Sequence, residues 1–149
     1  MVIDTSAVVA ILRQESGAEG LLHRLTAAGS RRISAASLLE TAIVLEGKSG
    51  ERGGEQLDLF LARAQVEVEP VTADQVRVAR KAWRRYGKGT GHPARLNFGD
   101  CFSYALAHSL GEELLYTGAD FAHTDVARSE AGSMGWEGSK AEGGGGVWG

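Results

Sequence analysis

Short apolar runs alternate along this chain with longer segments in which apolar residues recur every three or four positions. Runs of the first kind predict β-strands, and segments of the second kind predict amphipathic helices. Strands are expected over residues 1–3, 31–34, 66–71 and 113–118. Helices are expected over residues 5–12, 17–28, 35–48, 53–64, 72–86 and 100–110. Strands that alternate with helices favour a parallel sheet covered by helices, an α/β architecture.

The pattern changes near the C-terminus. Residues 132–149 contain eight of the 21 glycines, including the run "GGGG" at 143–146. A segment so poor in apolar residues cannot bury a core of its own. We therefore divide the chain into a folded domain, residues 1–128, and a glycine-rich tail, residues 129–149, that is expected to be disordered.

Composition places the chain among ordinary globular proteins. Its 149 residues suit one domain, and 43% of them are hydrophobic and 23% charged. No apolar run approaches the roughly 20 residues of a membrane helix, and no signal peptide is recognisable. One cysteine, Cys101, leaves no partner for an internal disulfide. We therefore expect a cytoplasmic protein with no membrane contact.

Net charge is −3, which argues against a protein that coats nucleic acid over its whole surface. The basic residues are nevertheless gathered between positions 77 and 95, where no acidic residue interrupts them. This segment is either a solvated helix face or a local patch that contacts phosphates. Trp83 and Tyr86 lie within it and could stack on bases, although packing of the long helix is the favoured interpretation.

Four isolated acidic residues are expected at one edge of the sheet. Asp4 follows the first strand, Glu40 lies early in the helix after the second strand, Asp100 opens a helix, and Asp120 follows the last strand. The carboxyl ends of parallel strands share one edge, where such folds bind ligands. Each acid also has an ordinary interpretation, as a helix cap, a polar-face residue or a turn residue, and Asp100 could form a capping arrangement with Asn97.

Their joint placement points to chemistry. Carboxylates crowded together either become protonated or hold a cation. An all-oxygen ligand set favours Mg²⁺ or Mn²⁺, and none of the histidines has zinc-like spacing. A divalent ion with open water positions suits hydrolysis of phosphodiesters. The basic segment would then hold the substrate backbone, and we select Arg84, Arg85, Lys88 and Arg95 as its RNA-contacting residues.

Four segments in order resemble the PIN domain and, more narrowly, the VapC toxins of bacterial toxin–antitoxin pairs. They are "VIDTSAVVAIL", "SLLETAIVL", "HPARLNFGDCFSYALA" and "LLYTGADFAHTD". The resemblance implies a three-layer α/β/α sandwich with a mainly parallel central sheet. It also implies an endoribonuclease that depends on Mg²⁺, or Mn²⁺ in its place, with Asp4, Glu40, Asp100 and Asp120 as catalytic, metal-binding residues.

The resemblance extends to supporting residues and partners. Thr5 or Ser6 is similar to the family hydroxyl beside the first acid, Asn97 to a supporting polar residue, and Thr117 is placed with them. Family substrates are structured RNAs, often tRNA or a ribosomal RNA loop. The family usually forms homodimers, and a cognate VapB antitoxin wraps the toxin and places a basic or bulky side chain in the acidic pocket.

One position departs from the family pattern. Many relatives have Asp, Asn or Glu immediately before the last acid, where this chain has Ala119. Asp125 could compensate in part, or could cap local structure. Two alternatives to a toxin therefore stay open: a housekeeping PIN-domain nuclease of RNA maturation, and a catalytically weakened module that binds RNA or protein.

Overall fold

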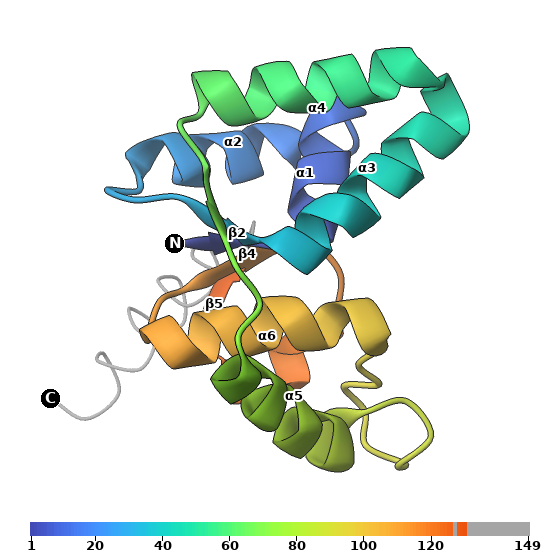
Figure 1. Ribbon diagram of the computed structural model, residues 1–149, viewed down its shortest axis with the longest axis vertical. Helices are drawn as coiled ribbons and strands as arrows, with labels where there is room; N and C mark the ends of the chain where they lie inside the picture. The colour runs from blue at the N-terminus through green and yellow to red at the C-terminus, as the bar shows by residue number, and fades with distance from the viewer. Residues whose placement is uncertain (127, 131–149) are drawn as a thin grey trace, which may run out of the picture.

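The computed structural model describes residues 1–126 and 128–130. Five parallel strands form one central sheet between two layers of helices (Figure 1). The strands are β1 (Val2–Ile3), β2 (Arg32–Ser34), β3 (Glu67–Glu69), β4 (Leu114–Tyr116) and β5 (Arg128–Glu130). Their order in the sheet is β3-β2-β1-β4-β5, so the first strand of the chain lies at the centre. The predicted three-layer α/β/α sandwich is confirmed.

The helices are divided between the two faces of the sheet. The described helices are α1 (Thr5–Leu12), α2 (Ala18–Ala27), α3 (Ala35–Ser49), α4 (Glu51–Arg63), α5 (Ala73–Tyr86), α6 (Phe98–Leu110) and the short 3₁₀ helix η1 (Phe121–His123). The first four lie on one side of the strands, and α5 and α6 pack against each other on the opposite side (Figure 1). Among the described residues, no helix combines the length and the apolar character needed to cross a membrane.

Alternation along the strands fills both faces with apolar side chains. Val2 belongs to the core beneath α5 and α6, whereas its neighbour Ile3 belongs to the core beneath the first four helices. In β4, Leu114 and Tyr116 share the first core and Leu115 the second. Successive strand residues point to opposite faces, so a strand covered on both sides must be apolar throughout. This explains why the central strands read as uninterrupted apolar runs.

Several boundaries differ from those predicted. Helix α6 begins at Phe98 rather than Asp100, because Asn97 caps it from the preceding position. Helix α3 ends at Ser49 rather than at Lys48, and α4 begins at Glu51, two residues before its predicted start at Gly53. The single residue between them, Gly50, has φ +59°, a conformation that glycine adopts without strain and that lets the chain reverse there.

Strand β5 lies across the predicted boundary between the folded domain and the tail. Ser129 and Glu130, which were assigned to the tail, belong to β5 and pair with Leu115 and Tyr116 of β4. The strand was missed because three residues ahead of a glycine-rich segment carry no alternating pattern of useful length. The remainder of the predicted tail, 131–149, lies outside the described residues.

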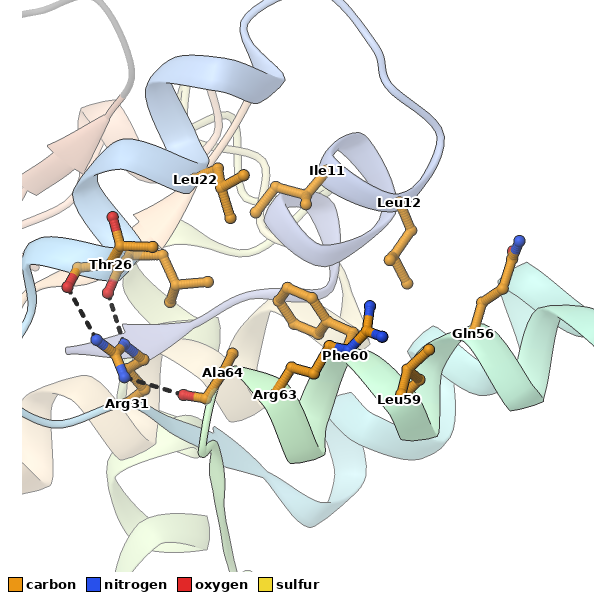
Figure 2. Close-up of a pocket in the computed structure, with 11 residues that line it drawn as sticks. Ile11, Leu12, Leu22, Thr26, Arg31, Gln56, Leu59, Phe60, Arg63 and Ala64 are labelled. Atoms are coloured by element: carbon orange, nitrogen blue, oxygen red, sulfur yellow. Dashed lines mark hydrogen bonds between the residues drawn. The ribbon is translucent and has the colours of Figure 1, made fainter.

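Arg31 joins the ends of two helices. Its guanidinium donates hydrogen bonds to the carbonyl oxygens of Leu25, Thr26 and Ala28 at the end of α2, at 2.6, 2.9 and 3.2 Å. It also donates to the carbonyl of Ala64 at the end of α4, at 3.0 Å (Figure 2). A cation at the carbonyl ends of two helices is favoured by both helix dipoles and satisfies carbonyls that lack helical partners.

We predict that Arg31→Gln lowers the free energy of unfolding by about 2 kcal/mol, because most of these charge-assisted bonds disappear. Urea denaturation of the full chain measures this loss. The matched control is Arg52→Gln, an exposed arginine of α4, which should change stability by less than about 0.5 kcal/mol. Equal stabilities of the two variants would contradict the assignment.

Candidate active site

All four predicted acids line one cavity of about 360 Å³, hereafter the acidic cavity. Asp4 follows β1 and caps α1, Glu40 lies in α3, Asp100 lies in the first turn of α6, and Asp120 precedes η1. The predicted supporting residues also line it: Thr5, Ser6, Asn97 and Thr117. Residues far apart in the chain meet here because strands β1, β2 and β4 end at the same edge of the sheet. Their catalytic roles stay predictions.

Asp4 is the most deeply buried of the four acids. Its side chain is only 3% exposed, and both carboxylate oxygens accept hydrogen bonds. The hydroxyl of Ser103 donates to one oxygen at 2.6 Å, and the backbone N–H of Ser6 donates to the other at 2.9 Å. These two bonds fix the plane of the carboxylate at the end of β1.

Buried hydroxyl groups continue from Asp4 into the helices around it. Ser103 of α6 lies 3.1 Å from the hydroxyl of Ser37 in α3. Thr5 of α1 donates to the carbonyl of Ser37 at 3.0 Å, and Thr41 of α3 donates to the hydroxyl of Thr5 at 3.0 Å. We call these four side chains the hydroxyl network. It joins the three helices that contribute Thr5, Glu40 and Asp100 to the acidic cavity.

Sequence reasoning missed Ser37, Thr41 and Ser103. Helical spacing puts Ser37 and Thr41 on a polar face with Glu40 and Lys48, which predicts exposure, and only Ser103 lies among apolar residues of its predicted helix. Such residues pack internally only when a partner satisfies the hydroxyl group. All three are essentially inaccessible to solvent.

Asp100 has a strongly perturbed carboxyl group. Burial is the largest cause and raises its pKa to about 7, with the nearby charges of Asp4, Asp120 and Glu40 adding to the rise. The backbone N–H of Asn97 opposes this shift by donating to the Asp100 carboxylate at 2.9 Å. Asn97 accepts in return from the Asp100 N–H at 2.9 Å, so the capping interpretation of Asp100 is confirmed alongside its place in the cavity.

Gly99 leaves room for the side chain of Glu40. A Cβ at this position would overlap with the Glu40 carboxylate, so a larger residue would force that carboxylate to move. Ser6 makes a hydrogen bond at the same edge, because its hydroxyl accepts from the backbone N–H of Thr117 at 3.1 Å. This bond ties the first turn of α1 to the chain that leaves β4 toward Asp120.

The donor set suits a hard divalent cation, although the side chains do not converge on one point. In residues 1–126 and 128–130, no three His, Cys, Asp or Glu side chains form a group placed to hold a metal ion. Existing contacts account for this: Asp100 turns toward the Asn97 N–H, and Glu40 lies against Gly99. Four carboxylates with hydroxyl and amide oxygens around them still offer the ligand chemistry that Mg²⁺ and Mn²⁺ prefer.

The predicted RNA-contacting residues lie away from the cavity lining. Arg84, Lys88 and Arg95 are exposed, and Arg84 lines a separate pocket between α5 and α6. The guanidinium of Arg85 lies 4.9 Å from the ring centre of Tyr86, which is buried as its packing interpretation requires. Contacts of these four residues with RNA stay predictions.

Asp125 does not take the place left by Ala119. It lies outside the cavity lining and accepts a hydrogen bond from the Tyr104 hydroxyl at 2.5 Å. That bond lowers the pKa of Asp125, so the carboxylate is held in its charged form as an anchor for the segment after η1. Asp125 therefore makes a structural contact, although with Tyr104 of α6 rather than as a cap of its own segment.

The structure places this protein among α/β domains in which a parallel sheet lies between two layers of helices and carboxylates gather at the carboxyl ends of the strands. Residues 1–127 match the PIN domain, and the chain belongs to the PIN-domain family.

Within that family its relatives are VapC-type ribonucleases. The chain is 54% identical over 127 residues to Ribonuclease VapC30 of Mycobacterium tuberculosis, covering 85% of this chain and 96% of that protein. It is 57% identical to Ribonuclease VapC of Mycolicibacterium smegmatis, covering 85% and 98%. The resemblance found in the four sequence segments is thereby confirmed.

Solved structures share the fold at lower identity. The sarcin–ricin-loop-cleaving toxin VapC20 of M. tuberculosis superimposes with a TM-score of 0.66 at 23% identity, covering 86% of this chain and 97% of that one. VapBC2 of Rickettsia felis, bound to a promoter DNA fragment, gives a TM-score of 0.68 at 17% identity, covering 87% and 96%.

We predict that Asp100→Asn stabilises the metal-free protein at pH 8. The folded-state pKa of about 7 lies above the unfolded value near 4, so wild-type stability falls as pH rises through this window. Asparagine carries no negative charge for burial to penalise. We therefore expect the free energy of unfolding of the variant to exceed that of wild type by about 1–2 kcal/mol at pH 8, and this difference to shrink toward pH 4.5. Thermal unfolding in EDTA at several pH values measures it.

The control for this prediction is Asp58→Asn, at an exposed carboxylate of α4 that lies outside the acidic cavity. It should show no gain that depends on pH in this way. A gap between Asp100→Asn and wild type that stays constant from pH 4.5 to pH 8 would show that Asp100 carries no electrostatic penalty.

Proposed function

We propose that this chain is a Mg²⁺-dependent endoribonuclease that cleaves structured RNA, the toxin of a VapBC-type pair. The observation that carries the proposal is the gathering of Asp4, Glu40, Asp100 and Asp120 at one cavity of a chain 54–57% identical to named VapC ribonucleases. A tRNA or a ribosomal RNA loop is the proposed substrate class, as the family resemblance implies.

The proposed chemistry is hydrolysis to a 5′-phosphate and a 3′-hydroxyl. Mg²⁺, or Mn²⁺ in its place, would be held by oxygens of the four acids and supplies a water of lowered pKa and positive charge beside the phosphoryl oxygens. Asp4 keeps one carboxylate orientation because Ser103 and the Ser6 N–H bind its two oxygens. Asp100, with a pKa of about 7, releases its proton readily when a cation competes for the carboxylate.

We propose that the antitoxin docks in an apolar groove of about 540 Å³ between α1, α2 and α4 (Figure 2). Leu22 and Leu59 line it and are 44% and 50% exposed. The groove leads toward the acidic cavity through a second hollow beside it. Ile11 and Leu22 line both the groove and this hollow, and Glu15 lines both the hollow and the acidic cavity. A helix in the groove could therefore extend a basic side chain to the acids.

A homodimer is also part of the proposal, because the family resemblance implies one. Leu39 and Ile43 are exposed one helical turn apart on α3, on either side of Glu40 in sequence. They offer an apolar strip against which a second copy could pack.

The first test is cleavage of total RNA by the purified full chain. We expect cleavage with Mg²⁺ or Mn²⁺, none with EDTA, and a loss of at least about 100-fold in Asp4→Asn and Asp100→Asn. Asp58→Asn, outside the cavity, should cleave like wild type. Absence of metal-dependent cleavage by folded protein free of antitoxin would favour the binding module over the enzyme.

The second test concerns the groove between α1, α2 and α4. Leu22→Asp and Leu59→Asp place a charge where an apolar helix face would lie, and each should raise the antitoxin concentration that halves RNA cleavage by at least about tenfold. Leu110→Asp, at an exposed leucine of α6, is the matched control. Cleavage without any inhibitory partner encoded beside this chain would instead support a housekeeping nuclease.

A further inference from the structure

Ser103 lies behind the acidic cavity and is not part of its lining. Its side chain is fully buried in α6. The hydroxyl group of Ser103 lies 2.6 Å from a carboxylate oxygen of Asp4 and 3.1 Å from the hydroxyl group of Ser37 in α3. Because Ser103 does not reach the cavity itself, it can act on a bound ion only through Asp4.

The hydrogen bonds around Ser103 have one possible direction. A hydroxyl group has one hydrogen to donate and two lone pairs that accept. Ser103 donates its hydrogen to Oδ1 of Asp4, so the hydroxyl group of Ser37 has to be the donor toward Ser103. Each donor in such a series polarises the next one. The bond from Ser37 therefore strengthens the bond that Asp4 receives.

Asp4 is held in its orientation from two sides. Ser103 of α6 binds Oδ1, and the backbone N–H of Ser6 in α1 binds Oδ2 at 2.9 Å. Rotation of the carboxyl group would break one of these bonds, yet each oxygen keeps a second lone pair for a cation. Asp100 and Glu40 have to turn from their contacts with Asn97 and Gly99 before they can share one ion with Asp4. Asp4 is therefore the acid that sets the direction from which an ion is bound.

Hard divalent ions differ in what they require of such a carboxylate. Mg²⁺ demands near-octahedral geometry at about 2.0–2.1 Å, whereas Ca²⁺ accepts about six to eight oxygens in irregular arrangements at about 2.3–2.6 Å. Mn²⁺ also binds octahedral oxygen sites. Groups that orient a metal ligand commonly contribute about 10- to 100-fold in affinity. A carboxylate with one fixed orientation therefore matters more for Mg²⁺ and Mn²⁺ than for Ca²⁺.

We propose that Ser103, supported by Ser37, is a positioning residue that makes the site prefer Mg²⁺ and Mn²⁺ over Ca²⁺. It does so by restricting Asp4 to one orientation. Because both hydroxyl groups are buried, neither contacts the ion or the RNA. The inference rests on the proposed metal-dependent function and adds to it the residues that determine the choice of ion.

The test measures ion binding without RNA. Full-length protein is treated with EDTA, desalted and titrated with Mn²⁺, and electron paramagnetic resonance reports the free Mn²⁺. Mg²⁺ and Ca²⁺ are then added as competitors. Ser103→Ala should weaken binding of Mn²⁺ and Mg²⁺ by about tenfold and binding of Ca²⁺ by less than about threefold.

The matched control is Ser34→Ala, the same substitution at another buried serine. Ser34 ends β2, and its hydroxyl group has no hydrogen-bond partner among the described residues. All three ions should bind this variant as they bind wild type. Equal weakening of the three ions by Ser103→Ala, or no weakening, would overturn the proposal, because a residue needed only for packing gives one of these results.

Ser37→Ala is the second variant. It removes the donor to Ser103 and leaves the bond between Ser103 and Asp4 in place. We expect it to weaken binding of Mn²⁺ by about twofold to threefold, with binding of Ca²⁺ unchanged. This variant decides the question if Ser103→Ala does not fold, and affinity for Mn²⁺ equal to that of wild type would then overturn the proposal.

Cleavage assays separate this inference from the proposed function. Wild-type protein that cleaves RNA with Mg²⁺, together with an unchanged ion preference in Ser103→Ala, overturns the role of Ser103 alone. A changed ion preference in Ser103→Ala, together with wild-type protein that never cleaves RNA, contradicts the nuclease and supports the role of Ser103. Wild-type protein that binds none of the three ions contradicts both.

Discussion

The site depends on one buried acidic side chain, that of Asp4 at the end of the central strand. A carboxyl group that is only 3% exposed is costly to bury unless its oxygens are satisfied. The Ser103 hydroxyl and the Ser6 N–H meet that requirement. Because Ser103 belongs to α6 and contacts Ser37 of α3, the same bonds fix the distance between the two layers of helices around the sheet. The geometry of the acidic cavity and the packing of α3 and α6 therefore depend on the same hydrogen bonds.

Asp100 shows the opposite balance. Its carboxylate is held by the helix cap yet suffers from burial and from three neighbouring acids, so the protein keeps a group near its ionisation point at the rim. Asp120 is more exposed than Asp100, and Glu40 is turned aside against Gly99. A cation bound among these acids would offset their mutual repulsion and stabilise the folded protein, which links the proposed metal site to the fold.

The groove between α1, α2 and α4 gives the proposed nuclease a surface for a partner apart from its four acids. It is apolar, and it reaches the acids by way of Glu15. A partner that docks there could therefore extend into the acidic cavity and block it.

The sequence by itself determined the α/β class, most helices and the rim that gathers the four acids. Apolar periods are local, and the common edge follows from the parallel direction of the strands, which alternation of strands with helices predicts. It could not reveal β5, because three residues have no readable period, nor the hydroxyl network, because Ser37, Thr41 and Ser103 acquire partners only across helices. Only the tertiary structure decided that Trp83 is exposed while Tyr86 is buried, since their burial depends on how α5 rotates against α6.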